Sequence, residues 1–108
     1  MAKNFIQDGD ILRFTATKAV KSGDVVVVGE MCGVAIADVE NKEQGVLRVS
    51  GVFNVKAKKS EDIKQGVVLY WDDGAGEATI TQGSHKVLGK AWSESGTSSS
   101  DVDVKLNV

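Results

Sequence analysis

GVVLYWDDGAG, at residues 66–76, is the stretch that decides the fold. It holds the only Tyr of the chain and one of its two Trp, and five strand-forming residues lead into an Asp-Asp-Gly turn. Successive side chains of a strand point to opposite faces, so Val67, Leu69 and Trp71 share one face and Val68 and Tyr70 share the other. Both faces are apolar or aromatic, and we expect both to be covered. The cover is either a second layer of the same domain or a neighbouring subunit.

Glycine punctuates the whole sequence, which has 12 Gly and no Pro. Short strands separated by Gly turns are typical of a β-sandwich or barrel. We therefore predict an all-β fold, a small sandwich- or barrel-like domain with at most one short helical turn. That turn is expected at residues 60–66, where Ser60 is a candidate N-cap and Gly66 a terminator. The expected strands lie at residues 11–16, 25–28, 31–37, 46–55, 67–71, 78–81, 87–92 and 101–108.

Two of these predicted strands have particular patterns. Residues 25–28 are four consecutive Val, which predicts a strand buried on both faces. Residues 46–55 read as one long strand, and Gly51 in its middle indicates a bulge or a close backbone approach.

A weak internal echo links two stretches of the chain. AVKSGDVVV (residues 19–27) and DIKQGVVLY (residues 62–70) both read apolar, Lys, polar, Gly and then a hydrophobic run. The echo indicates either a duplicated half or two similar turns that enter strands.

The length and composition indicate one domain with a short arm. A chain of 108 residues with 42% hydrophobic and 26% charged residues is globular and has room for one modest core. Residues 1–7 lack periodicity and are predicted to form an N-terminal arm, whereas residues 8–108 form the single β domain. Phe5 and Ile6 are apolar, so the arm is expected to dock on another surface. No apolar run approaches transmembrane length, and MAKNFIQDGD has no signal-peptide core, so no membrane partner is expected.

The charge and cysteine content exclude further classes. The formal net charge is −2 and no basic cluster is present, which argues against a nucleic-acid surface. The single Cys allows no intrachain disulfide.

No arrangement of residues points to catalysis or to a cofactor. Cys32 lies in an apolar strand and His85 in a polar turn, and a small buried thiol and a solvated His are favoured over a catalytic pair. The aromatic residues Tyr70, Trp71 and Trp92 are favoured as core or interface residues over a stacking platform for a sugar or a base. Neither an enzyme nor a small-molecule substrate is predicted.

Metal and phosphate sites lack their signatures as well. The pairs Asp8/Asp10 and Asp72/Asp73 are favoured as turn residues over Ca²⁺ ligands, and the chain has no set of zinc ligands. A phosphate loop is absent, because the only Gly-Lys pair is followed by Ala.

Several motifs together resemble a family of small proteins encoded in tailed phages and prophages. In order they are AKNFIQDGD (2–10), GDVVVVG (23–29), GVA (33–35), GVF (51–53), GVVLYWD (66–72), LGKA (88–91) and VDVKL (102–106). The family, once a domain of unknown function sometimes labelled a predicted recombinase, is understood as capsid cement, or head-decoration, protein. The recombinase label implies an ATP site that this sequence lacks.

The resemblance implies a non-enzymatic structural protein on the outside of a mature phage head. Such a protein is expected to form a homotrimer, to bind the major capsid protein and to stabilise contacts between its subunits. It would occupy the capsid exterior of the virion, and the cytoplasm of the bacterial host before assembly. On this interpretation the arm residues Phe5, Ile6 and Gln7 are candidate capsid contacts. The candidate subunit interface is Val68, Tyr70 and Trp71.

A second interpretation is a small barrel-sandwich binding module of a non-viral assembly. VKSGDVV (residues 20–26) is similar to the Gly-Asp turn of biotinyl- and lipoyl-type domains. Those carriers need a Lys at a hairpin tip, typically in Met-Lys-Met or Asp-Lys-Ala, and neither motif is present.

Overall fold

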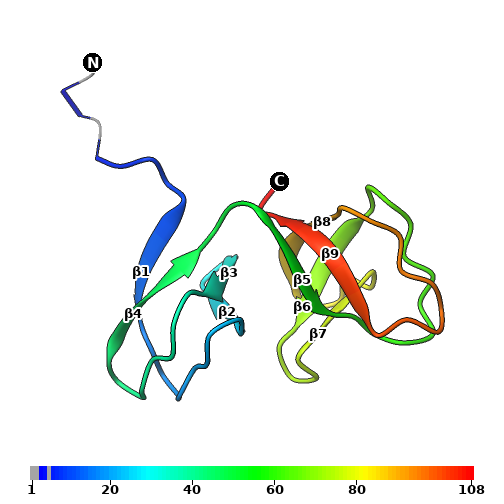
Figure 1. The fold of residues 1–108 in the computed structure, drawn as a ribbon, viewed down its shortest axis with the longest axis horizontal. Helices are drawn as coiled ribbons and strands as arrows, with labels where there is room; N and C mark the ends of the chain where they lie inside the picture. Colours follow the sequence, from blue (N-terminus) through cyan, green and yellow to red (C-terminus); the bar gives the residue numbers. More distant parts are fainter. Residues whose placement is uncertain (1–2, 5) are drawn as a thin grey trace.

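The computed structural model describes residues 3–4 and 6–108, which fold into nine β-strands (Figure 1). The strands are β1 (Ile11–Thr15), β2 (Val25–Val28), β3 (Met31–Ala35), β4 (Gln44–Arg48), β5 (Val52–Lys56), β6 (Val68–Asp72), β7 (Glu77–Thr79), β8 (Lys86–Ala91) and β9 (Asp101–Leu106). The all-β prediction is confirmed. Nowhere in the described residues does a helix occur that is long and apolar enough to cross a membrane.

The strands form two curled antiparallel sheets that lie side by side (Figure 1). The first sheet has the order β1-β4-β3-β2, and the second has the order β5-β9-β8-β6-β7. We call residues 8–50, which contain the first sheet, the first half, and residues 51–108 the second half.

The two halves repeat one pairing scheme. β1 pairs with β4, β4 with β3 and β3 with β2, just as β5 pairs with β9, β9 with β8 and β8 with β6. The register of the first three strands is the same as well: Leu47 lies between Leu12 and Ala35, and Val104 lies between Phe53 and Ala91. The pairing of β6 with β8 differs by a bulge between Leu69 and Tyr70. Residues that take the same place in this scheme are called equivalent below.

Hydrogen bonds outside the strands repeat in the same way. Val20 and Val39 exchange two backbone hydrogen bonds of 2.8 and 2.7 Å. In the second half Ile63 and Ser95 exchange two such bonds of 2.9 Å each. Each bridge ties the turn before a strand to the loop after its partner strand.

The sequence echo lies at equivalent places in the two halves. Gly23 has a φ of 91° and its N–H donates to the carbonyl of Ala35 at 2.9 Å. Gly66 has a φ of 90° and its N–H donates to the carbonyl of Ala91 at 2.8 Å. Glycine is needed at both turns because other residues rarely adopt this left-handed conformation. Of the two interpretations of the echo, the topology supports a duplicated half.

The halves differ in the connection that follows their second strand. β2 and β3 are joined by Gly29 and Glu30 alone, whereas residues 73–85 separate β6 from β8 and contain β7. β7 pairs with β6, and its Ala78 also forms a parallel bridge with Ala57 just beyond β5. β7 therefore closes the second half, while β2 pairs only with β3 and leaves the first half open along one edge.

Two hydrophobic cores follow this arrangement. The smaller core lies in the first half, and its buried residues are Phe14, Ala16, Val20, Ala35, Val39, Leu47 and Val49. The larger core fills the second half and extends into the first through Cys32 and Val34 of β3. Asn107 adds a polar connection, since its Nδ2 donates to the carbonyls of Cys32 at 3.0 Å and Val49 at 2.7 Å.

The predicted long strand at residues 46–55 is wrong, because it is two strands in two sheets. β4 ends at Arg48 and β5 begins at Val52, and Gly51 between them has a φ of 101°. Leu47 and Val55 are both buried, but in different cores. The alternation of apolar residues continues across the break, so periodicity could not reveal it. Gly51 is the crossover between the halves rather than a bulge.

The predicted helical turn at residues 60–66 is also wrong. Ser60 has a φ of 73°, and Ile63 is fully buried and bridges Ser95, which holds the segment extended. Tertiary burial of Ile63 overrides the local capping signal.

The prediction that the valine run at residues 25–28 is buried on both faces is wrong too. All four Val are only half-buried, because β2 is an edge strand. The remaining predicted strands agree with the structure to within two residues at each end.

Candidate functional site

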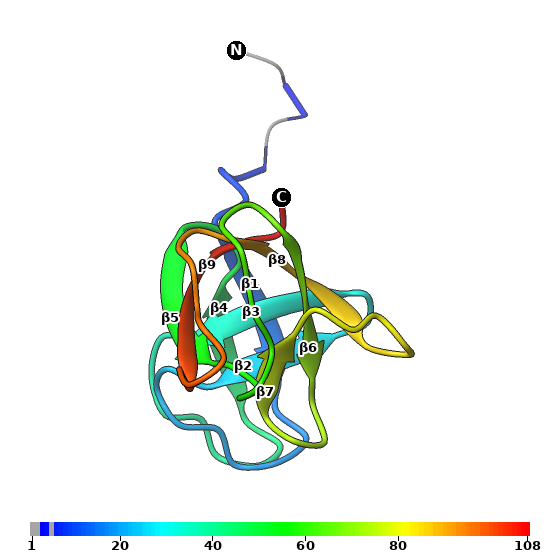
Figure 2. The same cartoon turned by 90° about the vertical axis from the view of Figure 1, so that its right-hand side faces the viewer.

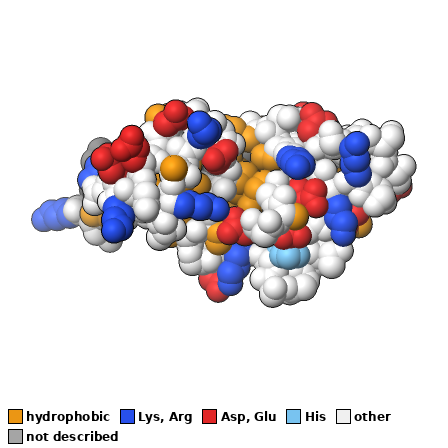
Figure 3. Space-filling model, turned by 90° about the horizontal axis from the view of Figure 1, so that it is seen from below, with side chains coloured by type: hydrophobic (Ala, Val, Ile, Leu, Met, Phe, Trp, Pro, Cys, Tyr) orange, Lys and Arg blue, Asp and Glu red, His pale blue; other side chains and the backbone are white. Residues whose placement is uncertain are grey.

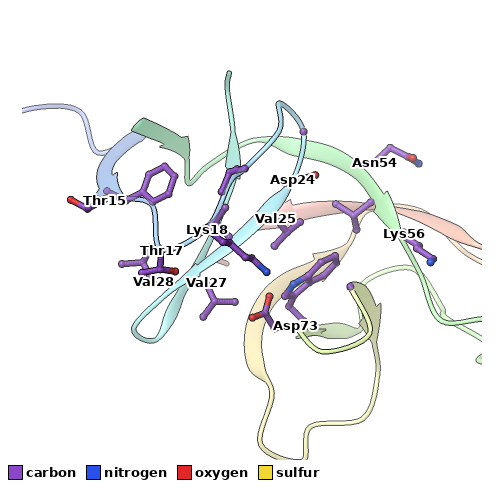
Figure 4. A pocket seen from close by; sticks show the side chains of 17 residues that line it. Thr15, Thr17, Lys18, Asp24, Val25, Val27, Val28, Asn54, Lys56 and Asp73 are labelled. Carbon is purple, nitrogen blue, oxygen red and sulfur yellow. The ribbon is translucent and has the colours of Figure 1, made fainter. Parts of the chain in front are cut away.

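The open edge of the first half faces a cavity of about 580 Å³ (Figure 4). One side of the cavity comes from β1 and the turn after it, and the next side is β2 with the two residues before it, Gly23 and Asp24. The second half supplies the third side through Val55, Trp71 and Asp73, among others. We call this cavity the open seam. Hydrophobic side chains are also visible on the surface between the two halves (Figure 3).

Charged side chains of both signs surround the open seam. Lys18, Asp24, Lys56 and Asp73 all line it (Figure 4). Apolar walls with charged groups at the rim suit an extended peptide, because β2 offers backbone groups along its free edge.

Trp71, predicted as an interface residue, belongs to the larger core instead of the outer surface of the chain. Its side chain is 7% exposed, and Leu69 on the same face of β6 is fully buried. The indole Nε1 is buried without a hydrogen-bond partner among the described residues, and Trp71 also lines the open seam. The chain itself therefore covers one of the two faces of β6.

The opposite face of β6 carries Val68 and Tyr70, as the alternation predicted, but the chain itself does not cover this face. Val68 is 38% exposed and Tyr70 is half-buried. Tyr70 faces Val87 of the neighbouring strand β8, and Val87 is 41% exposed. These three side chains form a small apolar surface that the chain leaves uncovered.

The described part of the predicted arm projects away from the strands in two perpendicular views (Figure 1, Figure 2). Ile6 is 86% exposed. Gln7 Nε2 donates to the carbonyl of Ile11 at 2.8 Å, which holds the base of the arm against the start of β1. Phe5, the third predicted arm residue, lies outside the described residues.

The residues weighed for catalysis are placed in structural roles. Burial and the charge of Asp73 raise the pKa of the Cys32 thiol from 9.0 to about 11, so it is not a thiolate at neutral pH. His85 Nε2 lies 3.8 Å from a carboxylate oxygen of Asp72 in the turn region beside β7. Asp72 Oδ1 also accepts the backbone N–H of Ala75 at 3.1 Å, which is the turn role predicted for it.

Metal and carrier chemistry find no further support. No three His, Cys, Asp or Glu side chains come together as a metal site in the part of the chain that the structure describes. The tip of the β2–β3 hairpin is Gly29-Glu30, so it lacks the lysine that a swinging-arm carrier would modify.

Comparison with known protein families shows the family to which the chain belongs. A family described as phage cement protein matches residues 6–106, nearly the whole chain. The chain belongs to the phage cement protein family. Searches of curated proteins and of solved structures give no match.

Membership in the phage cement family confirms the predicted resemblance. It assigns the chain a structural, capsid-stabilising role in the phage virion. The match begins at Ile6, so it includes the base of the arm as well as both halves of the domain.

The open seam is the part of the candidate site that sequence reasoning missed. Lys18, at its rim, carried no signal of its own. A closer comparison of the echo would have helped, because 13 residues lie between β6 and β8 where two lie between β2 and β3. That difference in length shows that one half has an additional element.

Proposed function

We propose that this phage cement protein binds the outer surface of a tailed-phage head and stabilises contacts between subunits of the major capsid protein. The family match over residues 6–106 is the observation that carries the proposal. The open seam, the uncovered apolar side chains and the projecting arm support it, because each is a surface suited to a protein partner.

The proposed assembly is a homotrimer. Val68, Tyr70 and Val87 are candidates for contacts between copies, since they leave apolar area exposed on neighbouring strands. Trp71, the third predicted interface residue, lies on the opposite face of β6, where it lines the open seam. The arm residues Ile6 and Gln7 are proposed to reach a neighbouring molecule in the decorated shell.

Co-sedimentation with phage heads that lack the protein tests the proposed function. The full chain should pellet with mature heads and should raise the temperature at which the heads release DNA. A protein that stays in the supernatant at saturating concentration would contradict the proposal.

A deletion of residues 2–7 tests the arm separately. The deleted residues precede all strands, so the domain should keep its thermal unfolding midpoint while binding to heads weakens. Undiminished binding would remove the arm from the attachment surface.

A further inference from the structure

The second half shows how a strand fills the edge that the first half leaves open. β7 lies antiparallel to β6, with Ala78 opposite Trp71, and Ala78 also bridges Ala57 in parallel. Glu61 holds the end of β7, because its carboxylate accepts the Thr79 hydroxyl at 2.8 Å and the Ile80 N–H at 3.0 Å.

Among the residues that the structure describes, no strand occupies the equivalent place in the first half. Ala16 is equivalent to Ala57, because each directly follows the matching strand, β1 or β5. Val28 corresponds to Trp71 by its place along the strand, since each lies five residues after its turn glycine, Gly23 or Gly66. Lys18 lies two residues before Val20, just as Glu61 lies two residues before Ile63, the equivalent bridge residue. Lys18, Val20 and Val28 line the open seam.

We propose that the open seam of one copy receives the arm segment of residues 6–8 from a second copy as an additional strand on β2. The proposal rests on the homotrimer of the proposed function. It assigns the contact between copies to residues 6–8 of one copy and the open seam of the next. In the register of β7, Ile6 takes the place of Ala78, opposite Val28, and Asp8 takes the place of Ile80.

The sizes of the facing side chains fit this register. In the second half a small residue, Ala78, lies opposite a large one, Trp71, and both are buried. In the first half Val28 replaces the large residue, so the incoming strand needs a larger side chain to fill the seam. Ile6 supplies it, and at 86% exposure it is the most exposed of the large hydrophobic side chains that the structure describes.

The charges fit as well. The carboxylate of Glu61 faces the end of β7, two residues beyond Ala78. In the first half Lys18 stands at the position of Glu61, so a cation replaces the carboxylate. An incoming strand therefore gains an ion pair if it carries an acidic residue at the position of Ile80. Asp8 is two residues beyond Ile6 and meets the requirement. The other charged groups on the seam, Asp24, Lys56 and Asp73, sum to one negative charge. Lys18 is the one that takes the place of Glu61, two residues before the bridge residue Val20.

An unpaired donor provides an independent reason for a polar guest. Trp71 lines the open seam, and its buried Nε1 has no acceptor in the described residues. A buried donor without a partner destabilises the fold, because it has lost its hydrogen bond to water and gained none in return. A guest strand brings backbone carbonyls into the seam, one of which can accept this N–H.

The arm must come from another copy. A strand in the place of β7 runs parallel to β1, as β7 bridges the chain beyond β5 in parallel. Parallel neighbours need a connection of about a dozen residues or more. Only Gly9 and Asp10 separate the arm from Ile11, so the arm cannot enter its own seam. Exchange between copies is head-to-tail, and such a contact closes into a ring when its rotation allows.

Solution mass of the protein alone, by light scattering behind size exclusion, tests the proposal without any capsid. The full chain should exceed its 11.4 kDa monomer mass, with a closed trimer at three times that value. The Lys18→Glu and Asp8→Lys variants should each weaken self-association by about tenfold or more, as expected for a close charge pair. The double variant should restore it. Lys59→Glu, at an exposed residue that does not line the seam, is the matched control and should change nothing.

A mixing experiment shows the direction of the exchange. A chain without residues 2–8 keeps its seam but has no arm, whereas the Lys18→Glu chain keeps its arm but has a repelling seam. Each should be monomeric alone, and an equal mixture should give a species of two chains.

Three outcomes would overturn the proposal. They are a full chain that is monomeric at millimolar concentration, charge variants that keep their mass, and a double variant that fails to restore it. Charge variants that keep their mass but no longer bind heads would assign the seam to a strand of the capsid protein instead. If the full chain self-associates as expected but does not bind heads, the proposed function is contradicted and the arm exchange between copies is not.

Discussion

The closed second half and the open first half are built on one pairing scheme, and the difference between them is one inserted strand. β7 gives β6 a second neighbour and bridges the chain beyond β5, so the edge of that sheet is covered within the chain. β2 keeps a free edge beside a cavity of about 580 Å³. The repeated pairing scheme thus gives a second half whose edge is covered and a first half whose edge is free.

The equivalent glycines Gly33 and Gly89 give the largest expected contrast. A Cβ at Gly89 would collide with the backbone carbonyl of Lys105, whereas a Cβ at Gly33 would meet Leu47 Cβ at 2.8 Å and the Arg48 carbonyl at 3.1 Å. Since the overlap is much deeper at Gly89 and lies entirely with backbone, we expect Gly89→Ala to lower the free energy of unfolding by at least about 3 kcal/mol and Gly33→Ala by about 1–2 kcal/mol. Urea unfolding measures both, and equal effects would contradict the stated difference in packing.

Substitutions at Trp71 and Val28 compare how tightly side chains pack in the two halves. Trp71→Val should cost about 2–3 kcal/mol, because it leaves a cavity in the closed core. Val28→Ala should cost about 1 kcal/mol or less in a monomeric form, because Val28 is only half-buried. Thermal unfolding of both variants in the arm-deleted chain makes the comparison. A larger loss for Val28→Ala would show that the first half is as closed as the second.

Cys32 and Leu88 occupy equivalent buried positions, and only Cys32 can ionise. Burial first, and then the charge of Asp73, raise the folded pKa of Cys32 from 9.0 to about 11. The neutral thiol is therefore favoured by folding, so stability is unaffected below pH 9 and falls as the pH rises from 9 to 11. Between pH 9 and pH 11 the free energy of unfolding of the native protein should fall by about 2–3 kcal/mol more than that of the Cys32→Ala variant. Parallel pH profiles of the two proteins would argue against this burial of the thiol.

Glu61 gives the smallest effect. Glu61→Gln keeps the shape of the side chain but weakens the bonds to Thr79 and Ile80, and we expect a loss of about 1 kcal/mol. Hydrogen exchange should become faster in β7 and remain unchanged in β2. Faster exchange in both strands would mean that Glu61 supports the whole domain.

Part of this picture could be predicted from the sequence. Alternation at residues 101–106 and around Tyr70 gave the strands and their faces, because one face of each is buried. The crossover at Gly51 could not be predicted, since the apolar alternation passes through it unchanged. Ile63 was assigned to a helical turn because local capping residues surround it, while its bridge to Ser95 is a long-range contact.

Hydrophobic periodicity could not predict the open seam, for a related reason. A run of four Val is typical of a buried strand, and only the number of neighbouring strands shows that β2 lies at an edge. The number of neighbours depends on β7 having no equivalent in the first half. Composition and periodicity carry no information about that absence.

A cryo-electron microscopy reconstruction of heads decorated with the protein is the most direct test. We predict density for the two halves on the outer surface of the head, with a strand from a neighbouring copy beside β2 and Asp8 of that strand next to Lys18. Heads without outer density, or decorated heads whose β2 edge is empty, would contradict the proposed role of the open half.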